Sequence, residues 1–196
     1  MSLTVTRLRR RLWQAATVVI LVAAVGALRG PYMAIFGNLA GSPAQPARAA
    51  PCLPGQPVDI AYSPHIAAGE AASVRYNSTP ATSGPHFAFT VAPGVYDAPV
   101  PEGLTVHALE HGHVVIRYAS STPPEDVARL VTIAKRFSAD VVLAPYSGLD
   151  RGIALTAWGR IDLLERYDEQ RITDFVRQLR GRYDHGWTRR YDCDRA

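Results

Sequence analysis

The sequence predicts an α+β domain built on a small mixed sheet and preceded by a loop-rich region that bears most of the histidines. In the C-terminal half, β-branched runs and amphipathic helical patterns follow one another in the order β-α-β-β-α. Residues 58–103 are instead dense in Pro, Gly, Ser and Thr, which is typical of irregular loops held against a scaffold. The length of 196 residues and the hydrophobic content of 47% suit one domain with a real core.

The first strand and the first helix of this order have clear local signals. Val114–Tyr118 is a β-branched run suited to a buried strand. The predicted helix Pro124–Phe137 has proline in its first turn and Glu125 and Asp126 near its positive end, with Thr122 as the expected cap. These signals predict that the strand leads directly into a helix.

Two further strands and a helix complete the order. The strands are predicted at residues 141–144 and Ile153–Trp158, and the helix at Asp168–Arg180. The crossover implies that the first two strands pair in parallel, and we expect the third to join antiparallel. The order resembles half of a thioredoxin-like or ferredoxin-like sheet. Because the redox motif Cys-x-x-Cys is absent, the likeness of fold supplies no function.

The N-terminal segment predicts a location outside the cytoplasm. A basic cluster at Arg7–Arg11 precedes the uncharged run Leu12–Leu28, which would extend about 25 Å as a helix at ~1.5 Å per residue. Residues 1–29 therefore read as a membrane anchor or a cleaved signal segment, and we expect an uncleaved, single-pass anchor. Residues 30–57, rich in Pro, Gly and Ala, read as a linker, and residues 58–196 as the extracytoplasmic domain, secreted if the segment is cleaved.

The two cysteines fit an oxidising compartment. Cys52 follows the linker and Cys193 lies near the C-terminus, so a disulfide between them would tie the ends of the domain together. Closing so long a loop would stabilise the fold by ~4 kcal/mol in the chain-entropy treatment. We expect no nucleic-acid partner, because the net charge of +4 comes with no recognition motif and the arginine clusters lie at the two ends of the chain.

The histidines are the strongest functional signal. His107 and His111 are four residues apart in a predicted short helix, so both side chains lie on one face at the spacing that a metal requires. His86 closes the rigid segment Thr-Ser-Gly-Pro-His, and His65 lies in another loop of the same half. Two histidines are left out of the site: His113, expected to point away from His111, and His185, expected to be solvated in a basic tail.

We therefore predict a metal site made by His86, His107 and His111, with His65 as a fourth candidate ligand. Imidazole ligands without thiolate fit copper or zinc. Three histidines and an open position would suit a metalloenzyme, whereas four would favour a closed site for metal binding or delivery. The sequence does not decide between these two functions.

Glu110, between the paired histidines, is the candidate catalytic residue. His-x-x-Glu-His matches the inverted zincin pattern, in which the acid is the general base, but Gly112 would cut this helix short. Glu110 could instead orient a ligand histidine, or form a buried ion pair with Arg117 or Arg160. In that last case the motifs would be structural, and the domain would be an accessory protein with a partner in a membrane complex.

Four ordered motifs carry a family resemblance. They are Tyr76-Asn77-Ser78 with Thr82-Ser83-Gly84-Pro85-His86, Gly94-Val95-Tyr96-Asp97, His107-Ala108-Leu109-Glu110-His111-Gly112, and Leu155-Thr156-Ala157-Trp158-Gly159-Arg160. Over about residues 58–180 the chain resembles an uncharacterised bacterial family with a domain of unknown function, typically carried behind one N-terminal membrane segment. The resemblance implies that these motifs gather at one site, and it implies no particular reaction.

Overall fold

The computed structural model describes residues 53–188. The predicted anchor, most of the predicted linker and both cysteines lie outside these residues. The helices and strands, in chain order, are β1 (Gln56–Pro57), β2 (His65–Ile66), the 3-10 helix η1 (Ala68–Ser73), β3 (His86–Phe87), β4 (Gly94–Val95), α2 (Glu102–Glu110), β5 (Val114–Tyr118), α3 (Pro124–Arg136), β6 (Val141–Pro145), β7 (Ile153–Ala157), β8 (Arg160–Leu164) and α4 (Glu169–Leu179).

The fold is α+β, as predicted, with a six-stranded mixed sheet in the order β1-β8-β7-β5-β6-β4. β5 pairs in parallel with β6 and antiparallel with β7, so both expected pairings are confirmed. β8, which was not predicted from the sequence, returns antiparallel along β7 after a tight turn at Trp158-Gly159. β1 pairs with β8 and lies within the residues that were assigned to the linker.

Both long helices begin close to their predicted positions. Asp168 caps α4, where its side chain accepts a hydrogen bond of 3.0 Å from the Arg171 backbone N–H. The expected cap of α3 is wrong: Pro123 holds the N-cap position, and the Thr122 hydroxyl instead donates to the carbonyl of Gly152 at 3.2 Å. The proline-rich start of α3 is as expected. Proline has no backbone N–H, and an N–H in the first turn would have no acceptor within the helix.

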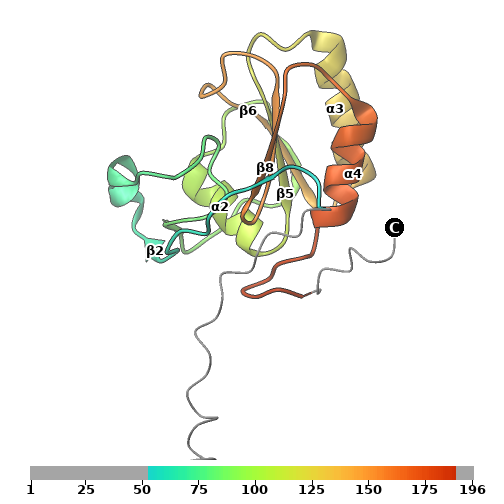
Figure 1. Ribbon diagram of the computed structural model, residues 1–196. Coiled ribbons are helices and arrows are strands. Elements are labelled where there is room, and N and C mark those ends of the chain that lie inside the picture. The colour runs from blue at the N-terminus through green and yellow to red at the C-terminus, as the bar shows by residue number, and fades with distance from the viewer. Residues whose placement is uncertain (1–52, 189–196) are drawn as a thin grey trace, which may run out of the picture. The chain divides into compact units, whose positions relative to one another are not determined.

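The sheet is covered on both faces (Figure 1). α3 and α4 pack on one face through an apolar core that includes Ile116, Leu143, Leu155 and Phe175. α2 and the preceding loops cover the other face through a second core: Ala81, Val91, Val106, Ala108, Leu109, Val115, Val142 and Trp158. The second layer sets the histidine-bearing segments against the sheet.

A separate two-stranded ribbon lies against α2. β2 and β3 run parallel, with His65 opposite His86. Gly103 makes the close approach of β3 and α2 possible, because a β-carbon there would lie 2.9 Å from the Phe87 ring. No helix within residues 53–188 is long and apolar enough to cross a membrane.

Candidate metal centre

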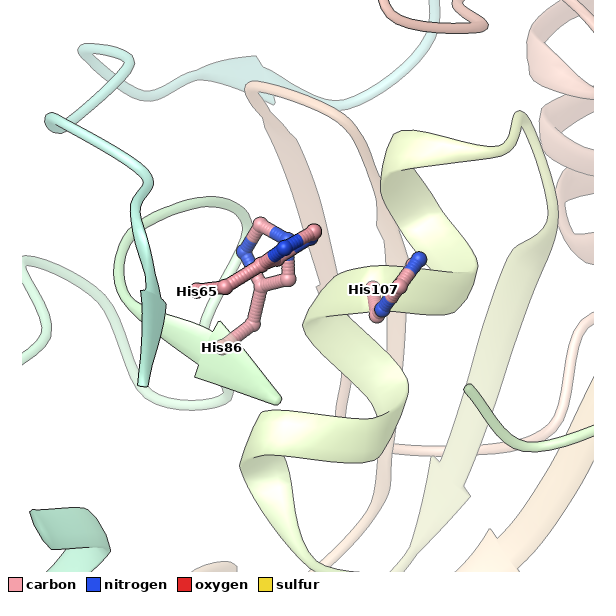
Figure 2. Close-up of side chains that lie close together, drawn as sticks. All are labelled: His65, His86 and His107. Carbon is pink, nitrogen blue, oxygen red and sulfur yellow. The ribbon is translucent and has the colours of Figure 1, made fainter. Parts of the chain in front are cut away.

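Three histidines from three separate segments converge beside α2. His65 comes from β2, His86 from β3 and His107 from the middle of α2 (Figure 2). Their ring centroids are 5.0 Å apart for His65–His86, 5.3 Å for His65–His107 and 5.0 Å for His86–His107. One potential ligand atom from each of the three lies within 4.8 Å of the others. The fold thus brings together residues that are up to 42 positions apart in the chain.

The Thr-Ser-Gly-Pro-His segment holds His86 in the interior. Thr82, Ser83 and His86 are fully buried. The Ser83 hydroxyl oxygen accepts a hydrogen bond of 3.0 Å from the Ala61 N–H, and the Gly84 N–H donates to the Ser63 hydroxyl at 3.0 Å. The His86 backbone N–H donates to Pro64 at 3.1 Å, which fixes β3 beside β2. These contacts explain why this loop can present a side chain as rigidly as a strand.

Backbone carbonyls set the tautomers of two ligand candidates. Nδ1 of His86 lies 2.9 Å from the Gly84 carbonyl, and Nδ1 of His107 lies 2.6 Å from the Phe87 carbonyl. Because a carbonyl only accepts, both Nδ1 atoms carry the proton, and Nε2 of a neutral ring is left with a free lone pair. Burial lowers the pKa of His107, and the neighbouring histidines lower it further. His107 therefore favours the neutral form that binds metals.

His111 continues the cluster toward solvent. Its Nε2 lies 2.9 Å from Nε2 of His107, and its Nδ1 lies 3.2 Å from Oδ1 of Asp184. The predicted one-turn spacing on α2 thus brings the two rings into a stack, with centroids 4.8 Å apart. His111 is 37% exposed at its side chain, so this end of the cluster is open.

Glu110 lies between the two ends of the cluster. Its Oε2 atom is 3.1 Å from Nε2 of His86 and 3.6 Å from Nδ1 of His185, and its side chain is 12% exposed. The alternative partners expected for Glu110 are wrong. Arg117 pairs with Glu102, and Arg160 donates to the backbone carbonyls of residues 53–55.

Asp184 and His185 belong to the cluster, although neither was predicted from the sequence to do so. His185 is exposed, as expected, but its ring meets that of His111 edge-on at 4.7 Å, and its N–H donates to the Glu110 carbonyl at 3.3 Å. His111, Asp184 and His185 form a second group with one potential ligand atom each within 4.8 Å of the others. The signal was the aromatic pair Tyr183 and Trp187 around them, which marks a packed segment rather than a solvated tail.

The donor set fits a metal that prefers nitrogen. Nε2 of His86 is buried and makes no hydrogen bond, although the Glu110 carboxylate lies beside it. A buried nitrogen without a hydrogen bond is costly unless something binds it. Two nitrogens that bind one zinc ion at ~2.0–2.1 Å are about 2.9–3.4 Å apart, so the spacing of these rings needs only a small adjustment. Carbonyl groups that orient the far ring nitrogen are the usual support of metal-binding histidines.

The cluster lies apart from a surface hollow that the described residues form beside β1 and α4. That hollow, of about 580 Å³, is lined by residues near β1 and of α4, by Asp162 of β8 and by no histidine. His65 and His111 are exposed instead at the molecular surface. A ligand would therefore reach the histidines directly from solvent.

Comparison with known proteins gives a family and no activity. The family described as "Protein of unknown function (DUF3105)" matches residues 67–194. Searches of curated proteins and of solved structures each gave no significant match, so the likeness to half of a thioredoxin-like or ferredoxin-like sheet stays a prediction. The match includes His86, His107 and His111, with Glu110, Asp184 and His185. The expected membership in a family of unknown function is confirmed: the chain belongs to the DUF3105 family.

Proposed function

We propose that the protein is a metal-binding domain for copper or zinc, tethered to the outer side of a membrane. The observation that carries the proposal is the convergence of His65, His86 and His107 from β2, β3 and α2. Two of the three have their Nδ1 proton engaged by a carbonyl, so each keeps Nε2 for a ligand. Hydrophobic packing alone does not require this arrangement.

The chemistry of the donors favours copper or zinc. Three imidazoles without a thiolate are intermediate in softness and suit Cu(II) and Zn(II) better than Mg²⁺ or Ca²⁺, which prefer oxygen. His65 is exposed while His86 and His107 are buried. A site with two fixed ligands and one accessible ligand suits uptake and release of an ion more than permanent structural binding.

The proposed location rests on the N-terminal sequence. Arg7–Arg11 before the uncharged run Leu12–Leu28 supports an anchor with its basic end inside. The predicted linker at residues 30–57 would then hold the domain a short distance from the membrane on the outer side. Ions at this position would be those that enter or leave the cell envelope.

Metal content of the full-length protein tests the proposal. The chain would be purified in detergent under oxidising conditions, loaded with Zn(II) or Cu(II), dialysed and measured by inductively coupled plasma mass spectrometry. His86→Ala and His107→Ala should lose the ion that His65, His86 and His107 hold in the wild type, whereas His113→Ala should retain it. His113 is the matched control because it follows α2 and belongs to neither ligand group. Wild-type protein that retains no ion, and binds none at micromolar levels, would favour a structural accessory role.

Glu110 supports a second candidate, a metalloenzyme. A largely buried carboxylate 3.1 Å from a ligand nitrogen is where a general base beside a metal would stand. Zinc-loaded protein would be assayed against a panel of esters and peptides, and copper-loaded protein for oxygen uptake with phenols. In this function Glu110→Gln retains the metal of the His65, His86 and His107 group and loses turnover. No turnover by the wild type would leave the metal-binding function alone.

A further inference from the structure

We propose that the cluster binds two metal ions, the second held by His111, Asp184 and His185, with Glu110 shared between the two sites. This inference rests on the proposed function, because it adds a second ion beside that of His65, His86 and His107. The second group is chemically different: it contains a carboxylate and is mainly exposed. It unites the end of α2 with a loop more than 70 residues later in the chain.

The second group has the geometry of a ligand set. His111 Nδ1 lies 3.2 Å from Asp184 Oδ1, and the His111 and His185 rings meet edge-on with centroids 4.7 Å apart. One imidazole or carboxylate donor from each residue lies within 4.8 Å of the others. Two imidazoles and one carboxylate are a common donor set of zinc and other transition-metal sites.

The loop that supplies Asp184 and His185 is held in place. The Gly181 N–H donates to the Gly112 carbonyl at 2.8 Å, and the Thr188 N–H donates to the Arg182 carbonyl at 2.9 Å. Gly112 is required at the contact: its φ is +81°, and a β-carbon there would lie 2.5 Å from the Tyr183 carbonyl oxygen. These contacts fix the loop against the end of α2.

Aromatic packing fixes the same loop from the side of the sheet. The Tyr183 ring stacks on buried Trp158 with centroids 4.8 Å apart, and Trp187 meets Tyr183 edge-on at 5.1 Å. Asp184 and His185 lie between these two aromatic residues. His185 itself has a positive φ of 51°, which is uncommon for a residue with a side chain and persists where the surroundings impose it. The loop thus presents the two donors in a defined conformation.

Glu110 joins the two groups. The same oxygen lies 3.1 Å from Nε2 of His86 in the first group and 3.6 Å from Nδ1 of His185 in the second. His107 and His111, one from each group, are also in contact through their Nε2 atoms at 2.9 Å. A carboxylate between two divalent ions offsets their mutual repulsion, and paired ions ~3.5–4 Å apart are established in other proteins. Glu110 and Asp184 supply the negative charge that the first group lacks.

A proton on His111 is the alternative to a second metal ion. Protonated His111 would donate from Nδ1 to Asp184 and from Nε2 to His107, and would satisfy these contacts without an ion. That arrangement leaves Nε2 of His86 without a hydrogen bond and gives His185 no function beside Glu110. In this case Asp184 and His185 would contribute nothing to metal content.

Zinc stoichiometry separates the two arrangements. Full-length protein would be titrated with Zn(II), and bound ions counted by mass spectrometry after dialysis, with His113→Ala as control. We expect two equivalents in the wild type and in the control, and one in Asp184→Asn and in His185→Gln. Because both residues are exposed, these variants should keep the fold, which circular dichroism would check. His86→Ala should retain the second ion.

The outcomes distinguish this inference from the proposed function. One equivalent in the wild type, unchanged in Asp184→Asn and His185→Gln but lost in His86→Ala, would overturn the second site and keep the first. No bound zinc at all would overturn both. If Glu110 is shared, two Cu(II) ions are coupled magnetically through it. The electron paramagnetic resonance signal of Cu(II)-loaded wild type should then be weaker than its copper content requires, and Glu110→Gln should restore the full intensity. Full intensity in the wild type would overturn the sharing of Glu110.

Discussion

His107 and His111 direct their Nε2 atoms at each other across 2.9 Å from successive turns of α2. The Nδ1 proton of His107 is engaged by the Phe87 carbonyl, so its Nε2 has only a lone pair to offer. Two facing lone pairs would repel each other. Either Nε2 of His111 therefore carries a proton, or a cation is bound beside the two rings. This contact makes the stability of the fold depend on what the histidines bind.

Metal loading should raise thermal stability. An ion that binds the folded chain at 100 times its dissociation constant adds ~2.7 kcal/mol, which corresponds to a rise of about 5–10 °C in Tm for a domain of this size. The measurement is differential scanning calorimetry of zinc-loaded and chelator-treated protein. The rise should be smaller in His86→Ala, which loses the ion of His65, His86 and His107, and should persist in full in His113→Ala. An equal rise in all three proteins would assign the effect to another site.

Gly103→Ala should weaken metal binding without removing a ligand. The new β-carbon would lie 2.9 Å from the Phe87 ring, so that ring must shift. We expect β3 to shift with it and to carry the Phe87 carbonyl away from His107. We expect a loss of about 1–3 kcal/mol in unfolding free energy, as for other overpacked sites, and a larger dissociation constant for zinc. Urea unfolding and calorimetric titration measure the two effects.

Gly69→Ala is the matched control for that substitution. A β-carbon at Gly69 meets nothing within 4 Å. This variant should keep both the stability and the zinc affinity of the wild type. Equal zinc affinity in Gly103→Ala and Gly69→Ala would contradict the importance of the contact between β3 and α2.

The buried ion pair of Arg117 and Glu102 should be costly to break. The Arg117 side chain is 2% exposed and donates to Glu102 at 2.9 Å, and its guanidinium lies 4.3 Å from the centre of the Tyr146 ring. Glu102→Ala should destabilise the fold by about 3 kcal/mol, because it leaves a buried charge without its partner. Adding Arg117→Met should recover part of the loss, since the charge is then removed. Urea unfolding of the two single variants and the double variant measures this coupling.

Stability should fall at high pH because of Tyr76. Burial, followed by the charge of Glu102, raises the pKa of Tyr76 to about 12. Tyrosine in the unfolded chain ionises at about 10, so this contribution is complete below pH 10 and is lost as pH rises toward 12. Urea unfolding at pH 9 and pH 11.5 should show a larger loss in the wild type than in Tyr76→Phe. An equal loss in both would show that Tyr76 does not titrate as proposed.

Most helices and strands of the sheet layer could be predicted from the sequence because their signals are local. The β-branched run Val114–Tyr118 and the amphipathic pattern of α3 each specify one element, and the crossover between β5 and β6 fixes their parallel pairing. β8 was missed although the turn Trp158-Gly159 before it was visible. Its residues alternate imperfectly: Ile161 and Leu164 are buried, but so are Arg160 and Asp162, through their polar contacts.

The candidate site was predictable only in part. The spacing of His107 and His111 is a property of one helix, and it could be read directly. The position of His65 beside His86 depends on a ribbon of two-residue strands, too short to leave a periodic pattern. Asp184 and His185 approach Glu110 only because their loop docks on Gly112 and Trp158, a tertiary contact that local sequence does not specify.

Anomalous X-ray diffraction at the zinc absorption edge, from crystals of zinc-loaded protein, tests the metal centre most directly. The proposed metal centre predicts an anomalous peak among the ring nitrogens of His65, His86 and His107, within ~2.0–2.1 Å of the nitrogens that bind the ion. A crystal of His107→Ala grown in the same way should lack that peak. Well-ordered histidines with no peak between them, at a zinc concentration that occupies other surface sites, would contradict the metal centre.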